Sequence, residues 1–296
     1  MTTDIEWGNQ QKWPDCLVIV RHGESVRNVA KNEAKTVGKG AFGTGLRDVD
    51  TPLTEAGRLQ AKHTGEYLSN HFVFDAVFSS PYKRTVQTTE GILAAFEMKP
   101  PVVLEERIRE IEFGILDGLT REGIVEVYPS ESLRRKREGK YWYRPPGGES
   151  RPDVALRVHS FLGTLTRDYR CKKVLIVCHS VVVLIFRRLL ERWGEEEYIK
   201  VDREDDVENC SVTIYTFDQE SKRLLLDRYN SAAHLKETRP KAPRRPLAHK
   251  EFTKRSKFRR RSNVCQCTPR EPARIGAKLW RVNYVEILHL ADADRA

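Results

Sequence analysis

Two apolar runs in the sequence each lead directly into a polar segment that contains a histidine, and this feature constrains the fold most strongly. Residues 16–20 read Cys-Leu-Val-Ile-Val and are followed by Arg21, His22 and Gly23. Residues 173–178 read Lys-Val-Leu-Ile-Val-Cys and are followed by His179. Short continuous apolar runs are typical of parallel strands that are buried on both faces. Because ligands bind beyond the carboxyl ends of such strands, the two histidines are predicted to share one site.

Further strands and helices are predicted between and after these two runs. Additional strands are expected at residues 75–80, 211–217 and 223–227, with a turn at residues 218–222. Helices are expected at residues 54–68, 81–96, 151–169 and 181–193. Thr54 is a candidate N-cap, and Pro81 suits a first helical turn. This alternation predicts an α/β, three-layer fold with a mostly parallel central sheet flanked by helices.

The positive charge of the chain is concentrated near its C-terminus. The 296 residues include 52 Lys+Arg and 42 Asp+Glu, which gives a net charge of +10. Residues 236–296 alone hold 17 Lys+Arg and 6 Asp+Glu, so the rest of the chain is close to neutral. We therefore predict a catalytic domain at residues 1–235 and a basic, Pro-containing, flexible tail at residues 236–296. The tail is expected to contact polyanions weakly through residues 254–261, unless it is only a solubilising extension.

Several protein classes are disfavoured by composition. The longest apolar stretch, residues 181–186, is too short to span a bilayer, so no membrane partner is expected. The first 13 residues are polar and lack a signal-peptide pattern, and the six cysteines lack paired spacing. A reducing, cytoplasmic setting is therefore expected. Cys265 and Cys267 alone are a weak metal signal, and no metal or cofactor is expected.

The segment Arg21-His22-Gly23 has the residue types that phosphoryl transfer requires. An imidazole at a strand end can attack phosphorus and carry the phosphoryl group covalently. A neighbouring guanidinium can bind phosphate oxygens, and glycine allows a close approach of the backbone. The alternative interpretation is a capping histidine beside a surface arginine.

Seven segments in a fixed order give this chain a resemblance to a known family. It resembles the histidine phosphatase superfamily, also called phosphoglycerate mutase-like, over roughly residues 15–230. The segments are Val20-Arg-His-Gly-Glu-Ser-Val-Arg-Asn28, Thr51-Pro-Leu-Thr-Glu-Ala-Gly-Arg-Leu-Gln-Ala61, Phe78-Ser-Ser-Pro-Tyr-Lys-Arg-Thr-Val-Gln-Thr88, Ile108-Arg-Glu-Ile-Glu-Phe-Gly114, Arg144-Pro-Pro-Gly-Gly-Glu-Ser150, Val177-Cys-His-Ser180 and Asn209-Cys-Ser-Val212.

The resemblance implies a role for each of five residues. His22 would be the phosphorylated nucleophile, and Arg21 and Arg84 would hold the phosphoryl oxygens. His179 would donate a hydrogen bond to the phosphoryl group and help to orient His22. Glu110 would protonate the leaving oxygen and then deprotonate the attacking water. These roles fit the chemistry, because two arginines and a histidine can stabilise three equatorial oxygens without a metal.

The resemblance also implies substrate contacts from smaller side chains, and alternatives stay open. Asn28, Ser25 and Ser180 are candidate substrate-binding residues, although Asn28 also suits a local turn and the two serines suit helix caps. Ser180 stands where many family members have glycine. Taken alone, Arg84 would be a surface cation and His179 a packed core histidine. For Glu110, the alternative acid is Glu112.

The resemblance favours a metal-independent phosphomonoesterase acting on a small phosphorylated substrate. The alternatives are a 2,3-bisphosphoglycerate-dependent phosphoglycerate mutase and a polyanion-binding protein that uses the tail. Cofactor-dependent mutases usually have an aromatic residue where Arg27 stands here. Residues 29–50 are expected to form a long Lys- and Gly-rich loop that either shapes substrate access or is a surface insertion. The basic residues 134–137 are expected on a solvated face of a helical cap.

Overall fold

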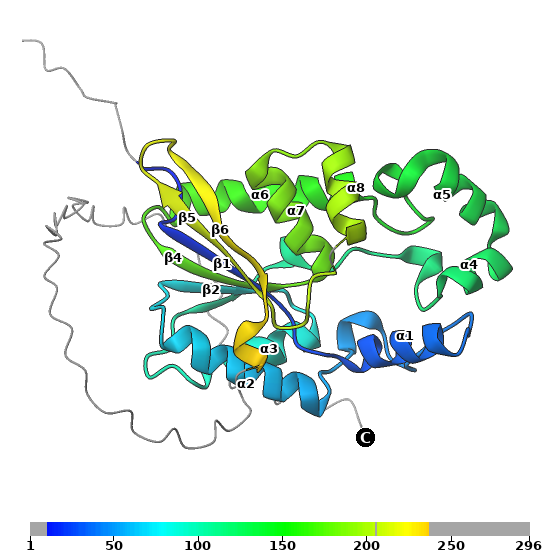
Figure 1. Ribbon diagram of the computed structural model, residues 1–296, viewed down its shortest axis with the longest axis horizontal. Helices are drawn as coiled ribbons and strands as arrows, with labels where there is room; N and C mark the ends of the chain where they lie inside the picture. The colour runs from blue at the N-terminus through cyan, green and yellow to red at the C-terminus, as the bar shows by residue number, and fades with distance from the viewer. Residues whose placement is uncertain (1–10, 205, 237–296) are drawn as a thin grey trace, which may run out of the picture. The chain divides into compact units, whose positions relative to one another are not determined.

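A computed structural model describes residues 11–204 and 206–236 and has a six-stranded sheet at its centre (Figure 1). The strand order is β3-β2-β4-β1-β5-β6. β1, β4, β2 and β3 pair in parallel, whereas β5 and β6 are antiparallel. The strands are β1 (Cys16–Arg21), β2 (Ala76–Ser79), β3 (Val102–Leu104), β4 (Lys173–Cys178), β5 (Val212–Asp218) and β6 (Arg223–Ser231).

Helices cover both faces of this sheet and also extend beyond its edge. The α-helices are α1 (Val26–Thr36), α2 (Glu55–Ser69), α3 (Lys83–Leu93), α4 (Arg121–Val127), α5 (Pro129–Trp142), α6 (Arg151–Asp168), α7 (Ser180–Glu191), α8 (Glu195–Glu204) and α9 (Ala233–Lys236). Three 3-10 turns, η1 (Asp48–Asp50), η2 (Glu106–Ile108) and η3 (Gly114–Leu116), lie in the connections. Gly139 has φ +82° inside α5, so this helix is kinked there.

The alternation of side chains along β1 builds the core on both faces of the sheet. Leu17 and Ile19 belong to the cluster that also includes side chains from α6 and α7. Val18 and Val20 belong to the opposite cluster, which includes side chains from α2 and α3. Figure 1 shows α2 and α3 on one side of the sheet and α6 and α7 on the other. The predicted three-layer α/β fold with a mostly parallel sheet is therefore confirmed.

The structure corrects two local predictions. Residues 29–50 are not one loop, because α1 extends to Thr36 and only the residues after Val37 carry the glycines. Ser25 and Asn28 form a reciprocal capping box that starts this helix. Pro81 precedes α3 instead of joining its first turn, since Tyr82 is the N-cap. Strand β3 and helices α4 and α8 were not predicted from the sequence.

Two of the sequence predictions concern residues outside this description. The tail at residues 236–296, apart from its first residue, and the pair Cys265 and Cys267 lie outside the described ranges. Within those ranges, no helix combines the length and the hydropathy that crossing a membrane requires.

Candidate active site

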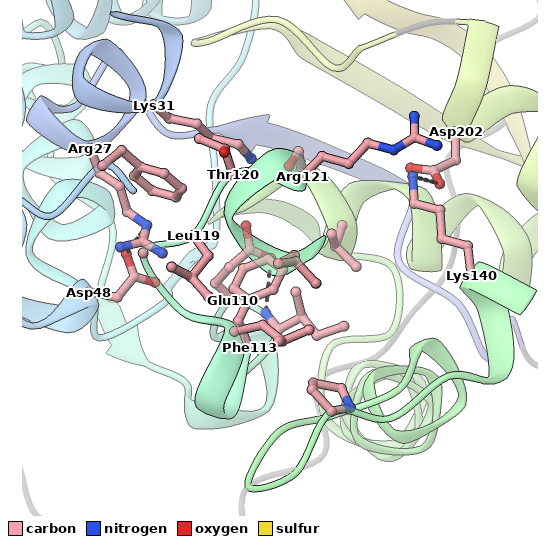
Figure 2. A pocket seen from close by; sticks show the side chains of 18 of the residues that line it. Arg27, Lys31, Asp48, Glu110, Phe113, Leu119, Thr120, Arg121, Lys140 and Asp202 are labelled. Carbon is pink, nitrogen blue, oxygen red and sulfur yellow. Dashed lines mark hydrogen bonds and ion pairs between the residues drawn. The ribbon is translucent and has the colours of Figure 1, made fainter. Parts of the chain in front are cut away.

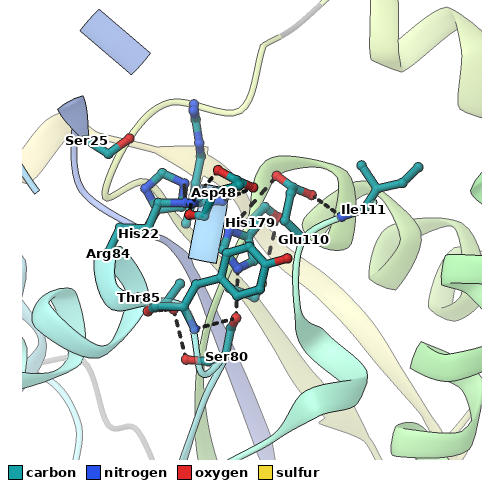
Figure 3. Close-up of polar contacts among 12 residues, drawn as sticks. His22, Ser25, Asp48, Ser80, Arg84, Thr85, Glu110, Ile111 and His179 are labelled. Carbon is teal, nitrogen blue, oxygen red and sulfur yellow. Dashed lines mark hydrogen bonds and ion pairs between the residues drawn. The ribbon is translucent and has the colours of Figure 1, made fainter. Parts of the chain in front are cut away.

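His22 is held at the end of β1 by its backbone and by both ring nitrogens. Its N–H donates to the Cys178 carbonyl at 2.9 Å, which continues the pairing of β1 with β4. Nδ1 lies 2.7 Å from the Gly23 carbonyl, which can only accept a hydrogen bond. The ring proton is therefore assigned to Nδ1, and the Nε2 lone pair accepts from Arg84 Nε at 3.2 Å (Figure 3).

The surroundings of His22 keep its imidazole neutral. The side chain is 3% exposed. Burial, followed by the charges of Arg84 and Arg21, holds the pKa of His22 well below its usual value. A neutral imidazole with an unprotonated Nε2 is the form that can act as a nucleophile.

A close backbone contact supports the loop that carries His22. A Cβ added to Gly57 in α2 would lie 2.0 Å from the Glu24 carbonyl oxygen, and one added to Gly23 would lie 2.6 Å from the Gly57 oxygen. Only glycine permits this approach. The glycine after His22 therefore serves the packing of its loop against α2.

Arg84 is a buried residue of the site and not a surface cation. It projects from the first turn of α3 and is 3% exposed. Besides the bond to His22, Nη1 donates to the backbone and carboxylate oxygens of Asp48 at 2.7 and 2.9 Å. Nη2 donates to the second carboxylate oxygen at 3.2 Å. Arg84 thus joins His22 to a carboxylate on another segment (Figure 3).

Asp48 and Arg27 are site residues that the sequence analysis did not identify. Arg27 Nε lies 3.0 Å from Asp48 Oδ1, and the Arg27 guanidinium also pairs with Asp117. The side chains of Arg27 and Asp48 are only 13% and 16% exposed. The loop path that brings η1 against α3 is not encoded in a recognisable local pattern, so no sequence signal indicated this contact.

His179 lies behind His22 and is completely buried. The two ring centroids are 5.2 Å apart, and His179 Nε2 is 2.8 Å from the Ser80 hydroxyl. Burial and then the charge of Arg84 hold the pKa of His179 well below its usual value, which favours the neutral imidazole. Within the described part of the chain, Nδ1 has no hydrogen-bond partner and lies 4.0 Å from Glu110 Oε2.

Glu110, rather than the alternative Glu112, faces the pocket. Glu110 is 8% exposed, and its Oε1 accepts from the Ile111 N–H at 2.9 Å. Burial raises the pKa of the Glu110 carboxyl, although Arg84 opposes this effect. Glu112 is exposed and is absent from the pocket lining. A carboxyl with a raised pKa can donate a proton nearer to neutral pH.

The remaining predicted residues also line the pocket, in different ways. Arg21 donates to the Val207 carbonyl, and its buried Nε has no partner among the described residues. Ser25 and Asn28 are committed to the cap of α1, as their alternative interpretation supposed. Ser180 is the first residue of α7 and lines the pocket as well.

The pocket has a volume of about 690 Å³ and extends well beyond these residues. Its walls include residues of α1, α4, α5 and α8. Eleven Lys and Arg line it, against five Asp and Glu. Figure 2 shows Arg27 and Asp48 at one side and Arg121, Lys140 and Asp202 at the other.

The part of the pocket away from His22 contains cations that are not all paired with a carboxylate. Burial, and then the neighbouring charge of Arg151, lowers the pKa of Arg135. Arg151 is 8% exposed, and no partner for its Nε occurs in the described ranges. Lys140 pairs with Asp202. In residues 11–204 and 206–236, no cluster of three or more His, Cys, Asp or Glu could hold a metal ion.

Comparison with known proteins assigns the family. The family model of the histidine phosphatase superfamily (branch 1) matches residues 17–230. The solved mycobacterial glucosyl-3-phosphoglycerate phosphatase in complex with vanadate aligns with a TM-score of 0.56 and 27% identity, covering 74% of this chain and all of that one. The chain belongs to the histidine phosphatase superfamily.

Curated relatives of the chain include enzymes with different substrates. Phosphoserine phosphatase 1 of Hydrogenobacter thermophilus is 36% identical over 165 residues, which are 56% of this chain and 71% of that protein. The 6-phosphofructo-2-kinase/fructose-2,6-bisphosphatase 4 of Rattus norvegicus is 31% identical over 190 residues, which are 63% of this chain. The match covers only 35% of the rat enzyme.

Proposed function

We propose that this protein is a phosphomonoesterase that works through a phosphohistidine intermediate on His22. The observation that carries the proposal is the arrangement of the His22 ring, with Nδ1 donating to the Gly23 carbonyl and an unprotonated Nε2 facing Arg84. The low pKa of His22 keeps Nε2 unprotonated at neutral pH, so that it can attack phosphorus once the hydrogen bond from Arg84 Nε is released. Membership of the histidine phosphatase superfamily supports the same role.

In the first step, Nε2 attacks phosphorus and the bond between phosphorus and the leaving oxygen breaks. Arg84 and Arg21 stabilise the charge on the equatorial oxygens, because both line the pocket, Arg84 is buried and the Nε of the half-buried Arg21 is buried as well. If the Ser80 hydroxyl donates to His179 Nε2, the ring proton lies on Nδ1, and this unpaired donor serves a phosphoryl oxygen.

Glu110 transfers the proton in both steps. Its raised pKa keeps a fraction of the carboxyl protonated near neutral pH, so it donates to the leaving oxygen. The resulting carboxylate then accepts a proton from water, which attacks phosphorus as the bond to Nε2 breaks. Inorganic phosphate and protonated Glu110 are regenerated.

The charge of the pocket favours a substrate with a second anionic group. The cations Arg121, Arg135 and Arg151 line the pocket in addition to Arg21 and Arg84. A phosphate or carboxylate of the substrate at this part of the pocket would neutralise these charges. The binding of such a group would offset the repulsion among the cations of the lining. The rat relative, named for a bisphosphate, suggests fructose 2,6-bisphosphate as a probe of this substrate class.

Hydrolysis of p-nitrophenyl phosphate by a His22→Ala variant tests the proposal. The variant should lose all measurable activity, whereas His63→Ala, which changes a partly exposed histidine of α2, should retain it. EDTA should not lower the activity of the unmodified protein. Full activity of His22→Ala would contradict the mechanism. Conversion of 3- to 2-phosphoglycerate that depends on 2,3-bisphosphoglycerate would identify a mutase instead.

A further inference from the structure

The carboxylate of Asp48 occupies N–H donors of Arg84 that the proposed mechanism assigns to a phosphoryl group. It accepts two hydrogen bonds from Arg84, and its backbone carbonyl accepts a third. Together with the bond to His22, these bonds engage four N–H groups of a guanidinium that has five. Arg84 therefore has little capacity left for a phosphoryl oxygen while Asp48 is in place.

The contact has the chemistry of an arginine bound to an oxyanion. A guanidinium binds carboxylate and phosphate through the same pair of parallel N–H donors. Asp48 is further held by Arg27, at 3.0 Å from Nε. A carboxylate and a phosphate dianion on the same Arg84 donors would also repel each other. The two anions are thus alternative ligands of Arg84.

We infer that Asp48 is an internal anion that competes with the phosphoryl group for Arg84 and so weakens the binding of free phosphate. The inference rests on the proposed function, because it takes the site around His22 and Arg84 to be the phosphate site. When phosphate binds, the Asp48 carboxylate leaves Arg84. When product leaves, the carboxylate returns.

The position of Asp48 in the chain makes such a displacement feasible. It begins the short turn η1 directly after two exposed residues: Leu46 is 50% exposed and the Arg47 side chain 79%. Arg27 would keep its second partner, Asp117, when Asp48 moves. Displacement of the carboxylate therefore leaves Arg27 paired.

Competition of this kind distinguishes the substrate from the product. A ligand that must first displace Asp48 binds with an apparent Kd equal to its intrinsic Kd divided by the fraction of protein in which Asp48 is displaced. A substrate with a second anionic group gains further contacts in the far part of the pocket, whereas inorganic phosphate does not. Asp48 would therefore limit inhibition by the phosphate that the reaction releases.

Calorimetric titration with inorganic phosphate tests the inference in an Asp48→Asn variant. Asparagine keeps the shape but removes the charge, so phosphate should bind about tenfold tighter or more. Asp50→Asn is the matched control, since Asp50 lies in the same turn but pairs with the exposed Arg47. The control should bind phosphate within about twofold of the unmodified protein. Equal or weaker binding by Asp48→Asn would overturn the inference and show that Asp48 only orients Arg84.

A second measurement needs no variant and covers the case in which Asp48→Asn fails to fold. Saturating phosphate should speed amide hydrogen exchange at residues 47–51 of the unmodified protein, because Thr51 N–H donates to the Asp48 carbonyl at 3.3 Å and η1 would be released. Slower or unchanged exchange would overturn the inference. Neither experiment requires turnover. Hydrolysis of p-nitrophenyl phosphate that does not depend on His22 would therefore contradict only the proposed function.

Discussion

The two ends of the pocket are built differently. At the end formed by the sheet, His22 and His179 follow neighbouring parallel strands and are 3% and 0% exposed. At the end formed by helices, Arg121 is exposed, and Arg135 and Lys140 are half-buried. The two histidines of the sheet end are buried, whereas the helical end also offers charge on partly exposed side chains. In the proposed function, chemistry therefore belongs to the sheet end and substrate selection to the helical end.

The largest effect on this comparison should come from Glu110→Gln at the sheet end. Glutamine cannot supply a proton, so kcat for an alkyl phosphate should fall by a factor of about 10²–10⁴. The transfer step with p-nitrophenyl phosphate should change far less, since its leaving group needs no protonation. Steady-state kinetics measure kcat for the alkyl phosphate, and burst kinetics measure the transfer step with p-nitrophenyl phosphate.

Glu112→Gln is the matched control, because Glu112 is two residues away and exposed. It should leave both substrates unaffected. An equal loss in the two variants, or an equal loss of the transfer step for both leaving groups in Glu110→Gln, would contradict the assignment of Glu110 as the acid.

A smaller and more selective effect should follow from Arg135→Ala at the helical end. KM for fructose 2,6-bisphosphate should rise about tenfold, because one cation for the second anionic group is lost. KM and kcat for p-nitrophenyl phosphate should stay unchanged. Arg137→Ala is the control, since the Arg137 side chain in the same helix is 78% exposed. An equal loss of kcat/KM for both substrates in Arg135→Ala would contradict the proposal that the helical end serves only the second anionic group.

The smallest effect concerns the pH dependence of kcat/KM, which reports the sheet end alone. The pKa of Glu110 is raised, so its acid form persists to a higher pH, and the rate should fall as pH rises through this value. The pKa of His22 is lowered, so the nucleophile stays unprotonated well below pH 6.5 and is lost only in stronger acid. Arg135→Ala should leave the profile unchanged, and a shifted profile in this variant would contradict the separation.

The sheet end could be predicted from the sequence because its signals are local. Each apolar run predicts a buried strand, and the histidine after the run is therefore predicted to lie at the carboxyl end of that strand. The pairing of Arg21 with Cys178 places both histidines at the same edge. Arg84 follows from its position just after β2, and its burial resolves the alternative of a surface cation.

The helical end could not be predicted in the same way. The position of Asp48 depends on the path of residues 37–50, which no local pattern determines. Helix α1 was missed because its capping box pairs Ser25 with Asn28 instead of the more recognisable Glu or Gln. Residues 134–137 were expected on a solvated face, but Arg135 and Lys136 line the pocket, as does Lys140 just after the kink at Gly139.

Direct detection of phosphohistidine tests the central claim of this account. In Glu110→Gln, transfer from p-nitrophenyl phosphate should remain fast while attack by water is slow, so the intermediate should accumulate. Rapid quenching at alkaline pH, digestion and mass spectrometry should then find one phosphoryl group on the peptide that contains His22. The account is contradicted if turnover proceeds with no phosphopeptide, or if the phosphoryl group is found on His179 instead.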